Sequence, residues 1–317
     1  MARHFPFPLP DGWFAVSYGD ELTAGQVRPL RVFGRDLVLF RTEAGQAHVL
    51  DAHCPHLGAH LGFGGRVAGE AIQCPSHGWC FGGDGVCRAI PSSSLSGPAA
   101  IPAEARIRAW PVVERNQMVW VWHHGGGAPP AFDVPVVAEA NSDDWTPLAR
   151  HVWQIRTRNQ EMGENAVDRA HFRYVHGTAT LPDSEIATDG VVRRAVQRAR
   201  MTTPRGEVDG CIESISVGMG IGIVRFTGIC ETVLLSSTTP VDDQIVETRF
   251  GFTQRKVGGE APRGGVGAAI IRDIVKQMNE DIPIWENKIF LERPKLCDGD
   301  GPIGEYRRWA RQFYSGV

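Results

Sequence analysis

Four metal-binding side chains lie in two short segments of the chain. Cys54-Pro55-His56 is followed, after seventeen residues, by Cys74-Pro75-Ser76-His77, so each segment supplies one thiol and one imidazole. In a [2Fe-2S] cluster two cysteines can bind one iron and two histidines the other, which raises the reduction potential above that of a four-cysteine ferredoxin cluster. We therefore expect Cys54, His56, Cys74 and His77 to hold an electron-accepting [2Fe-2S] cluster.

Tetrahedral zinc is the alternative for these segments, because two cysteines and two histidines also suit a structural zinc site. Zinc sites usually pair Cys with Cys and His with His, whereas each segment of this chain supplies one of each. Nearby glycines would also let backbone amides approach cluster sulfurs; they are Gly58, Gly62, Gly64, Gly65, Gly78, Gly82 and Gly83. Both features favour the cluster. Cys80 and Cys87, behind the second segment, are expected to be free, buried thiols.

A second constellation, Asp168, His171 and His176, falls within nine residues. The stretch from 159 to 176 has helical spacing, so two histidines can reach one metal with Asp168 close by. A non-haem iron that activates O2 is commonly held by two histidines and one carboxylate, with open positions for oxygen and substrate. That carboxylate must come from elsewhere, and Asp281 is the best candidate.

Taken alone, the two histidines are more simply read as ordinary surface or core residues. The first site changes this interpretation, because a chain that takes up single electrons at one iron centre needs somewhere to deliver them.

Composition limits the function classes. The chain has 317 residues, 42% of them apolar, enough for two domains with separate cores. Its 33 basic and 36 acidic residues give a net charge of -3, without the basic excess of a nucleic-acid-binding protein. The proline-broken N-terminus is not a secretory signal and no run of 18 apolar residues occurs, so we expect a cytoplasmic protein that is not integral to a membrane.

The pattern of short strands, turns and helices predicts two domains. Residues 12–124 read as short strands and turns, for example at 37–40, 47–50, 112–113 and 118–122. The run 125–130 suits neither helix nor strand, and we place the boundary there, with domains at 1–127 and 128–317. The second domain is predicted to contain a strand at 145–158, a meander at 211–256 and a long helix at 265–290, kinked or interrupted at Pro283.

The segment 217–224 is unusually apolar, with small residues at alternate positions. It can be interpreted as the wall of a wide pocket for a polycyclic substrate or, equally well, as an ordinary strand with glycine bulges.

Together, the two constellations resemble the oxygenase component of Rieske non-haem iron oxygenases. The pattern Cys54-x-His56-x17-Cys74-x2-His77, followed by Glu164-Asn165-x2-Asp168-x2-His171-x4-His176, has both motifs in the family's order. The resemblance implies an α+β chain, with an all-β Rieske [2Fe-2S] domain followed by a helix-grip (START-like) catalytic domain that has an antiparallel sheet and a long C-terminal helix. It also implies a homotrimer, in which the cluster of one subunit lies near the mononuclear Fe(II) of its neighbour.

The resemblance also assigns roles to single residues. Asp168 matches the family's aspartate that links a cluster histidine to an iron histidine across the subunit interface, and Asn165 of the same motif is taken as a second catalytic residue. The segments 281–288 and 307–314 are similar to 3-ketosteroid 9α-hydroxylases and Neverland-type cholesterol 7-desaturases. This similarity identifies Asp281 as the carboxylate ligand, although the chain is shorter than the actinobacterial hydroxylases.

The expected function is that of a terminal oxygenase. It would use O2 and electrons from a separate NAD(P)H-dependent reductase, with or without a ferredoxin, to hydroxylate or desaturate a small hydrophobic polycyclic substrate, a steroid or sterol. The chain has no nucleotide-binding fingerprint, which supports an external reductase. Two alternatives stay open: an aromatic-ring dihydroxylating dioxygenase, whose large subunits are generally longer, and a Rieske electron carrier without oxygenase activity, which would need no second half of this size.

Overall fold

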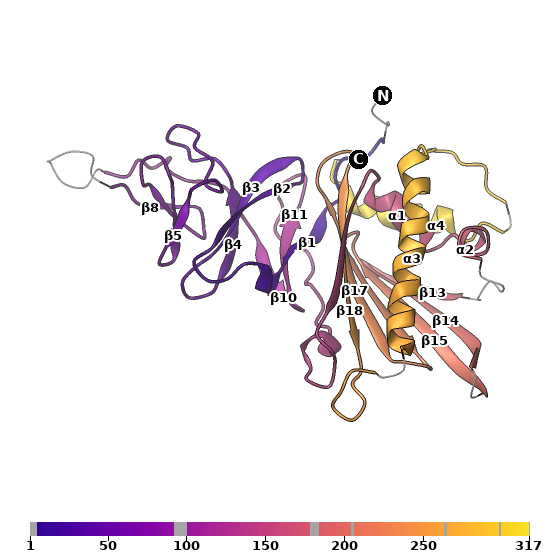
Figure 1. Ribbon diagram of the computed structural model, residues 1–317. Helices are drawn as coiled ribbons and strands as arrows, with labels where there is room; N and C mark the ends of the chain where they lie inside the picture. The colour runs from indigo at the N-terminus through magenta and orange to yellow at the C-terminus, as the bar shows by residue number, and fades with distance from the viewer. Residues whose placement is uncertain are drawn as a thin grey trace. The chain divides into compact units, whose positions relative to one another are not determined.

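The computed structural model describes residues 5–91, 100–177, 184–203, 206–262, 265–297 and 299–316. The chain forms two compact units (Figure 1). The N-terminal unit comprises Ala15–His123 with Pro129–Ala131, and the C-terminal unit comprises Met1–Phe14, His124–Ala128 and Phe132–Val317.

Short strands build the N-terminal unit, as predicted. Its sheets have the orders β1-β11-β10, β2-β3-β4-β9 and β5-β6-β7-β8. The strands are β1 (Gly12–Tyr18), β2 (Val27–Val32), β3 (Arg35–Arg41), β4 (Ala47–Asp51), β5 (Arg66–Ala68), β6 (Ala71–Gln73), β7 (Cys80–Gly82), β8 (Cys87–Ala89), β9 (Ala109–Trp110), β10 (Val112–Arg115) and β11 (Met118–His123). Residues 37–40 of β3 are fully buried, which explains their continuous apolar run.

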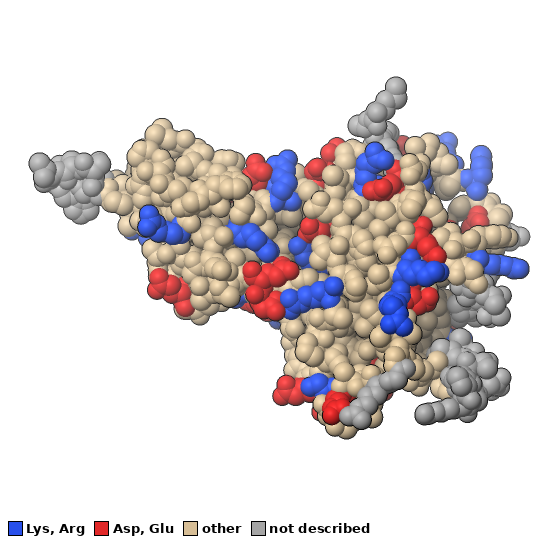
Figure 2. All heavy atoms as spheres, viewed as in Figure 1, with Lys and Arg blue, Asp and Glu red and all other residues tan. Residues whose placement is uncertain are grey.

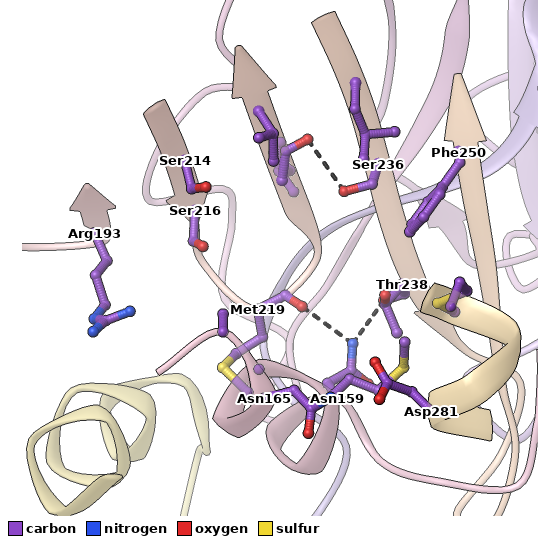
Figure 3. Close-up of a pocket in the computed structure, with 18 of the residues that line it drawn as sticks. Asn159, Asn165, Arg193, Ser214, Ser216, Met219, Ser236, Thr238, Phe250 and Asp281 are labelled. Atoms are coloured by element: carbon purple, nitrogen blue, oxygen red, sulfur yellow. Dashed lines mark hydrogen bonds between the residues drawn. The ribbon is translucent and has the colours of Figure 1, made fainter. Parts of the chain in front are cut away.

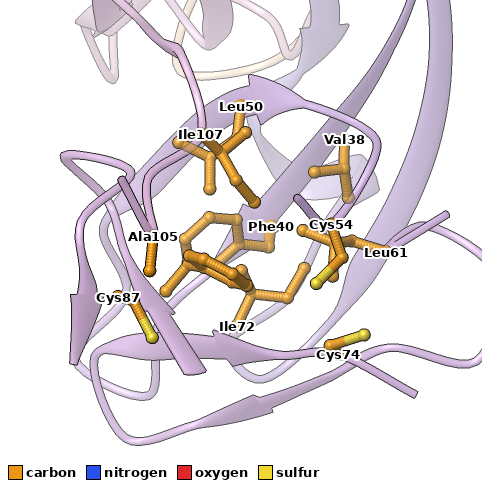
Figure 4. Packing of buried hydrophobic residues seen from close by; sticks show 11 residues of the cluster. Val38, Phe40, Leu50, Cys54, Leu61, Ile72, Cys74, Cys87, Ala105 and Ile107 are labelled. Atoms are coloured by element: carbon orange, nitrogen blue, oxygen red, sulfur yellow. The ribbon is translucent and has the colours of Figure 1, made fainter. Parts of the chain in front are cut away.

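The core of this unit lies next to the two cysteine-histidine segments. Phe40, Ile72 and Phe81 are fully buried in it, and Figure 4 shows Cys54 and Cys74 on one side of the cluster and Cys87 on the other. All seven cysteines are free thiols; Cys87 is buried as predicted, whereas Cys80 is half-buried. Because Cys74 directly follows β6, the core fixes where its thiol lies.

The C-terminal unit contains a seven-stranded antiparallel sheet with the order β12-β18-β17-β16-β15-β14-β13. Its strands are β12 (Ala149–Ile155), β13 (Ser184–Asp189), β14 (Val192–Thr203), β15 (Gly206–Val217), β16 (Ile221–Thr227), β17 (Thr232–Pro240) and β18 (Val246–Gln254). The predicted meander at 211–256 is confirmed, and the predicted strand at 145–158 is present but shorter. β13 and β14 were not predicted, because arginines at 193, 194 and 198 interrupt the apolar alternation of β14.

The long helix α3 (Val266–Asn287) confirms the helix predicted at 265–290. It continues through Pro283, so an interruption there is wrong, while the alternative of a kink stays a prediction. Pro283 lies near the helix end, where its missing N–H removes a single helical hydrogen bond. The Asn287 side chain also donates to the Pro283 carbonyl at 2.8 Å. Met278 and Trp285 of α3 are buried in a cluster with residues of β12 and β18, so the helix packs on the sheet (Figure 1).

The helical stretch predicted from 159 to 176 is divided into α1 (Asn159–Asn165) and α2 (Arg169–Tyr174). Asp168 causes the break, because its side chain accepts hydrogen bonds from the N–H groups of Ala170 and His171 at 3.0 and 3.3 Å. This N-cap requires extended backbone at Asp168. Asp168 therefore does not share a helical face with His171, and His176 lies beyond the end of α2.

A turn interrupts the segment 217–224, so the interpretation as a single strand is wrong. β15 ends at Val217 and β16 begins at Ile221. Between them Gly218 has a φ of +59°, in the left-handed region that glycine adopts most readily.

A last helix, α4 (Ile303–Ala310), follows α3 and was not predicted. None of the helices in the described part of the chain is both long and apolar enough to cross a lipid bilayer. Figure 2 shows acidic and basic side chains interspersed over the face in view. Opposite charges at such close spacing offset each other's field.

Candidate metal sites and substrate cavity

Two loops with matching backbone hydrogen bonds carry the predicted cluster ligands. The Cys54 carbonyl accepts from Gly58 at 2.9 Å, and the Cys74 carbonyl accepts from Gly78 at 3.1 Å. In each loop the cysteine N–H also donates to the carbonyl of the residue after the glycine. Gly58 and Gly78 have φ values of +77° and +75°, which side chains with a Cβ rarely adopt. The shared Cys-Pro-x-x-Gly pattern thus produces two equivalent turns.

The thiols and imidazoles of these loops lie in different environments. Cys54 and Cys74 are buried, whereas His56 and His77 are exposed. Burial raises the pKa of the Cys54 thiol to about 11. The His56 and His77 rings meet edge to face with centroids 4.6 Å apart, and Trp79 stacks on His56 at 4.6 Å. This donor set fits a [2Fe-2S] cluster with a buried thiolate end and an imidazole end open to electron exchange.

In the C-terminal unit, His171, His176 and Asp281 offer three ligand atoms within 4.8 Å of one another. The two imidazole rings have centroids 5.2 Å apart, and His176 Nε2 lies 3.4 Å from Asp281 Oδ1. Burial raises the pKa of the Asp281 carboxyl, against the opposing effect of both histidines. A bound cation would favour the charged carboxylate. Two imidazoles and one carboxylate are the donors expected for a non-haem iron.

Each of the two histidines is oriented by a hydrogen bond at its Nδ1 atom. His171 Nδ1 lies 2.7 Å from the carbonyl oxygen of Asp168, and His176 Nδ1 lies 3.0 Å from Glu280 Oε2. A carbonyl and a carboxylate can only accept, so both rings must carry their proton on Nδ1. Each Nε2 is thereby left with its lone pair free for a metal.

Asp281 reaches the site because it occupies a buried position of α3. Met278, Asp281 and Trp285 follow one another at helical spacing, and all three are buried. Burial of a carboxylate at a position that is usually apolar costs free energy unless a hydrogen-bond donor or a cation compensates its charge. This position marks Asp281 as functional rather than structural.

Asn165, at the end of α1, lies beside two of these ligands. Its Nδ2 is 3.4 Å from His171 Nε2, and its side chain also hydrogen-bonds Asp281. The preceding residue, Glu164, forms two hydrogen bonds with Arg307 of α4 at 2.8 and 3.0 Å. This largely buried pair ties α1 to α4, which helps to fix the position of Asn165.

The three converging residues line a cavity of about 320 Å³ (Figure 3). Its other walls come from the helices and from the strands β14 to β18. Six residues of the segment 217–224 contribute: Gly218, Met219, Gly220, Ile221, Gly222 and Val224. The segment therefore forms part of the cavity wall, while a polycyclic ligand for this cavity stays a prediction. Ser214, Ser216, Ser236 and Thr238 add hydroxyl groups to an otherwise largely apolar surface.

Sequence reasoning missed three residues of this region. Glu280 carried a weak signal, since it directly precedes Asp281. Glu164 belongs to the second motif, but its role could not be inferred from the sequence, because its partner Arg307 lies 143 residues away. Arg193, which also lines the cavity, lies on the strand that was not predicted.

Two family models match the chain. Residues 12–105 match the Rieske [2Fe-2S] domain, and residues 121–314 match the 3-Ketosteroid 9alpha-hydroxylase C-terminal domain. The second match covers well over half of the chain. The chain belongs to the Rieske oxygenases of this ketosteroid hydroxylase type. It is therefore an oxidoreductase, and the cysteine-histidine loops belong to a [2Fe-2S] domain rather than to a zinc site.

Curated relatives agree with this assignment. The oxygenase component of a 3-ketosteroid-9-alpha-monooxygenase from Rhodococcus rhodochrous is 30% identical, over 100% of this chain and 83% of the relative. A cholesterol 7-desaturase from Caenorhabditis elegans is also 30% identical, over 98% of this chain and 78% of the relative. The match over both halves does not fit the alternative of an electron carrier alone.

Solved structures share the fold of this Rieske oxygenase. NdmA from Pseudomonas putida CBB5, in a complex with caffeine, has a TM-score of 0.76 at 19% identity and covers 94% of this chain and 89% of its own. Dicamba monooxygenase bound to dicamba has a TM-score of 0.72 at 18% identity and covers 97% and 98%. The predicted α+β class, with a Rieske domain followed by a helix-grip domain, is confirmed.

Proposed function

We propose that this Rieske oxygenase hydroxylates or desaturates a steroid or sterol with O2. The printed activities of its relatives, a 3-ketosteroid monooxygenase and a cholesterol desaturase, support this substrate class. The relative is named as an oxygenase component, which supports a separate NAD(P)H-dependent reductase as partner, with or without a ferredoxin. The observation that carries the proposal is the convergence of two imidazoles and a carboxylate at the wall of a largely apolar cavity.

We assign the ligands accordingly. Cys54, His56, Cys74 and His77 hold the [2Fe-2S] cluster, and His171, His176 and Asp281 hold the mononuclear Fe(II). The matched turns of the two loops support the first assignment, and the Nδ1 hydrogen bonds of the two histidines support the second.

When bound, the cluster supplies single electrons and the mononuclear iron activates O2, which protein side chains cannot do. The chain's own residues determine where this chemistry happens. Asp168 and Glu280 hold the two imidazoles in the tautomer that keeps Nε2 free. Ile221, Leu234 and Phe250 line the cavity, where they exclude water and bind an apolar ring system.

We further propose a homotrimer in which Asp168 carries electrons from the cluster of one subunit to the iron of the next. Its Oδ1 caps α2, while its Oδ2 forms no hydrogen bond with a described residue and can accept one from another subunit. Asn165 acts beside the iron. The domain division at 127/128 and a cytoplasmic location complete the proposal; the family match of the C-terminal domain begins slightly earlier, at residue 121.

Turnover of a ligand panel tests the proposed function. The loaded protein, a surrogate ferredoxin and ferredoxin reductase, NADPH and O2 are incubated with sterols, 3-ketosteroids and small aromatics. We expect a steroid product with either one added oxygen atom, labelled by ¹⁸O2, or two hydrogens fewer, detected by mass spectrometry. Dihydrodiols from small aromatics, without any steroid product, would instead establish the ring-dihydroxylating alternative.

Replacing Glu280 by Gln is expected to lower the iron affinity by about tenfold to a hundredfold. The carboxylate accepts from His176 Nδ1 at 3.0 Å and makes the imidazole a stronger ligand than an amide partner would. Lys276→Met is the matched control, because Lys276 pairs with Glu280 at 2.7 Å on the exposed side of α3. Iron affinity is measured by competition with a chelator. Equal losses in both variants would mean that Glu280 acts through the surface ion pair and not through His176.

A further inference from the structure

A buried arginine without a counter-ion among the described residues lines the cavity. Arg193 on β14 is only 6% exposed, yet it forms no hydrogen bond or ion pair with any residue that the structure describes. Its guanidinium carbon lies 5.6 Å from the centre of the Tyr306 ring. Glu305, the nearby acidic residue, is exposed and beyond ion-pair distance. Burial lowers the pKa of Arg193, as expected for a charge that lacks a partner.

Three other buried or half-buried arginines of the chain are paired. Arg41 forms two hydrogen bonds with Glu114, at 2.7 and 2.8 Å, and Arg225 forms two with Glu139. Arg307 does the same with Glu164. A buried charge without an opposite charge destabilises the fold, so a guanidinium that faces a cavity without a described carboxylate partner indicates an anion that arrives with the ligand.

The strand register places Arg193 in a polar row on the cavity side of the sheet. Arg193 pairs with Ser216, Ser216 with Gly222, and Gly222 with Ser236. Residues opposite one another in antiparallel strands point to the same face. The hydroxyls of Ser214 and Ser216, both in the cavity wall, have no hydrogen-bond partner among the described residues. Arg193, Ser214 and Ser216 thus supply hydrogen-bond donors from two neighbouring strands to one wall of the cavity.

Arg193, Ser214 and Ser216 are remote from the proposed iron site. Figure 3 shows Arg193, Ser214 and Ser216 on one side of the cavity and Asp281 on the opposite side, near Thr238. Arg193 on β14 and Thr238 on β17 are three strand positions apart in the sheet. Three strand spacings correspond to about 14 Å. On the strands between them the cavity wall is formed by Ser216, Gly222 and Ser236 of the same cross-strand row as Arg193.

We propose that the substrate is an acidic steroid, whose carboxylate is bound by Arg193 with Ser214 and Ser216 while its ring system extends to the iron site. This inference rests on the proposed function and specifies its substrate class. A neutral ketone could accept hydrogen bonds at this position but could not compensate the charge. A carboxylate does both, because it matches the planar guanidinium with two parallel hydrogen bonds.

Binding of a matched ligand pair tests this proposal. Cholanic acid and its methyl ester share one ring system and differ in charge. Dissociation constants are measured by equilibrium dialysis with the metal-loaded protein. We expect the acid to bind at least about 30-fold more tightly than the ester, and Arg193→Met to abolish this preference. Arg193→Lys, which keeps the charge, should retain part of it.

Arg194→Met is the control, since Arg194 is exposed, pairs with Glu213 and is absent from the cavity wall. It should bind both ligands as the wild type does, and thermal melting checks that each variant is folded. Equal affinity of the wild type for acid and ester, or an equal loss of both in Arg193→Met, would overturn the acidic-substrate proposal while leaving steroid binding intact. If no steroid of either kind binds, and none from the neutral panel is converted, the proposed function itself fails.

Discussion

The His171→Ala, His176→Ala double variant is expected to lose one iron and all substrate oxidation while it keeps its cluster. The wild type should contain about three irons and about two acid-labile sulfides per chain, and the variant about two irons with the same sulfide. Removal of both imidazoles leaves Asp281 as a single ligand, which cannot hold the metal. Metal and sulfide analysis, together with EPR of the dithionite-reduced protein, measure both centres in one sample.

The separate cores of the two units make this test selective. The cysteines proposed to hold the cluster lie in the core of the N-terminal unit, so changes at His171 and His176 in the other unit should leave the Rieske signal unaltered. His151→Ala, on β12 of the same sheet, is the control and should retain the third iron, because His151 does not line the cavity. About two irons in fully loaded wild type and variant alike would refute the second site. Zinc without sulfide would refute the first.

The chemistry of this chain could be predicted from its sequence because the ligands are local. Each cysteine-histidine pair lies within four residues, and His171 and His176 are separated by four others. Ligand spacing of this kind does not depend on how distant segments meet. Asp281, more than a hundred residues away, could be assigned only through the similarity of segment 281–288 to the ketosteroid hydroxylases, because ligand spacing does not relate it to the two histidines. The meander was predictable as well, since its strands alternate clearly.

What could not be predicted depends on distant contacts or on competition between local structures. Asp168 interrupts the predicted helix because its side chain caps α2. The pattern of apolar residues does not show whether such a residue continues a helix or caps the next one. The pairing of Glu164 with Arg307 is set by how α1 and α4 pack. In the sequence, the charged Arg193 interrupts the alternation of apolar and polar residues that indicates a strand. Only the pairing of β14 with β15 places it in the cavity wall.

Asp168→Asn is expected to lower steady-state turnover by about tenfold to a hundredfold while both metal centres remain loaded. Asparagine caps a helix as well as aspartate does, so α2 and the carbonyl bonded to His171 Nδ1 should be retained. The variant therefore removes the negative charge and not the local structure. Asp168→Ala also removes the cap, at a cost of about 1 kcal/mol in stability. A melting temperature that falls in the alanine variant alone would separate the two effects.

The same variant tests whether electrons cross between subunits. When pre-reduced Asp168→Asn protein is mixed with O2 and substrate, the Rieske EPR signal should decay much more slowly than in wild type, because the path to the iron is impaired.

Mixed trimers provide a second readout that does not depend on Asp168. Chains that lack the cluster, through His77→Ala, and chains that lack the iron, through the double histidine change, should be inactive alone and recover activity when co-assembled. A mixture that stays inactive, although both chains are present in one oligomer, would place electron transfer within a single chain and leave Asp168 as a helix cap.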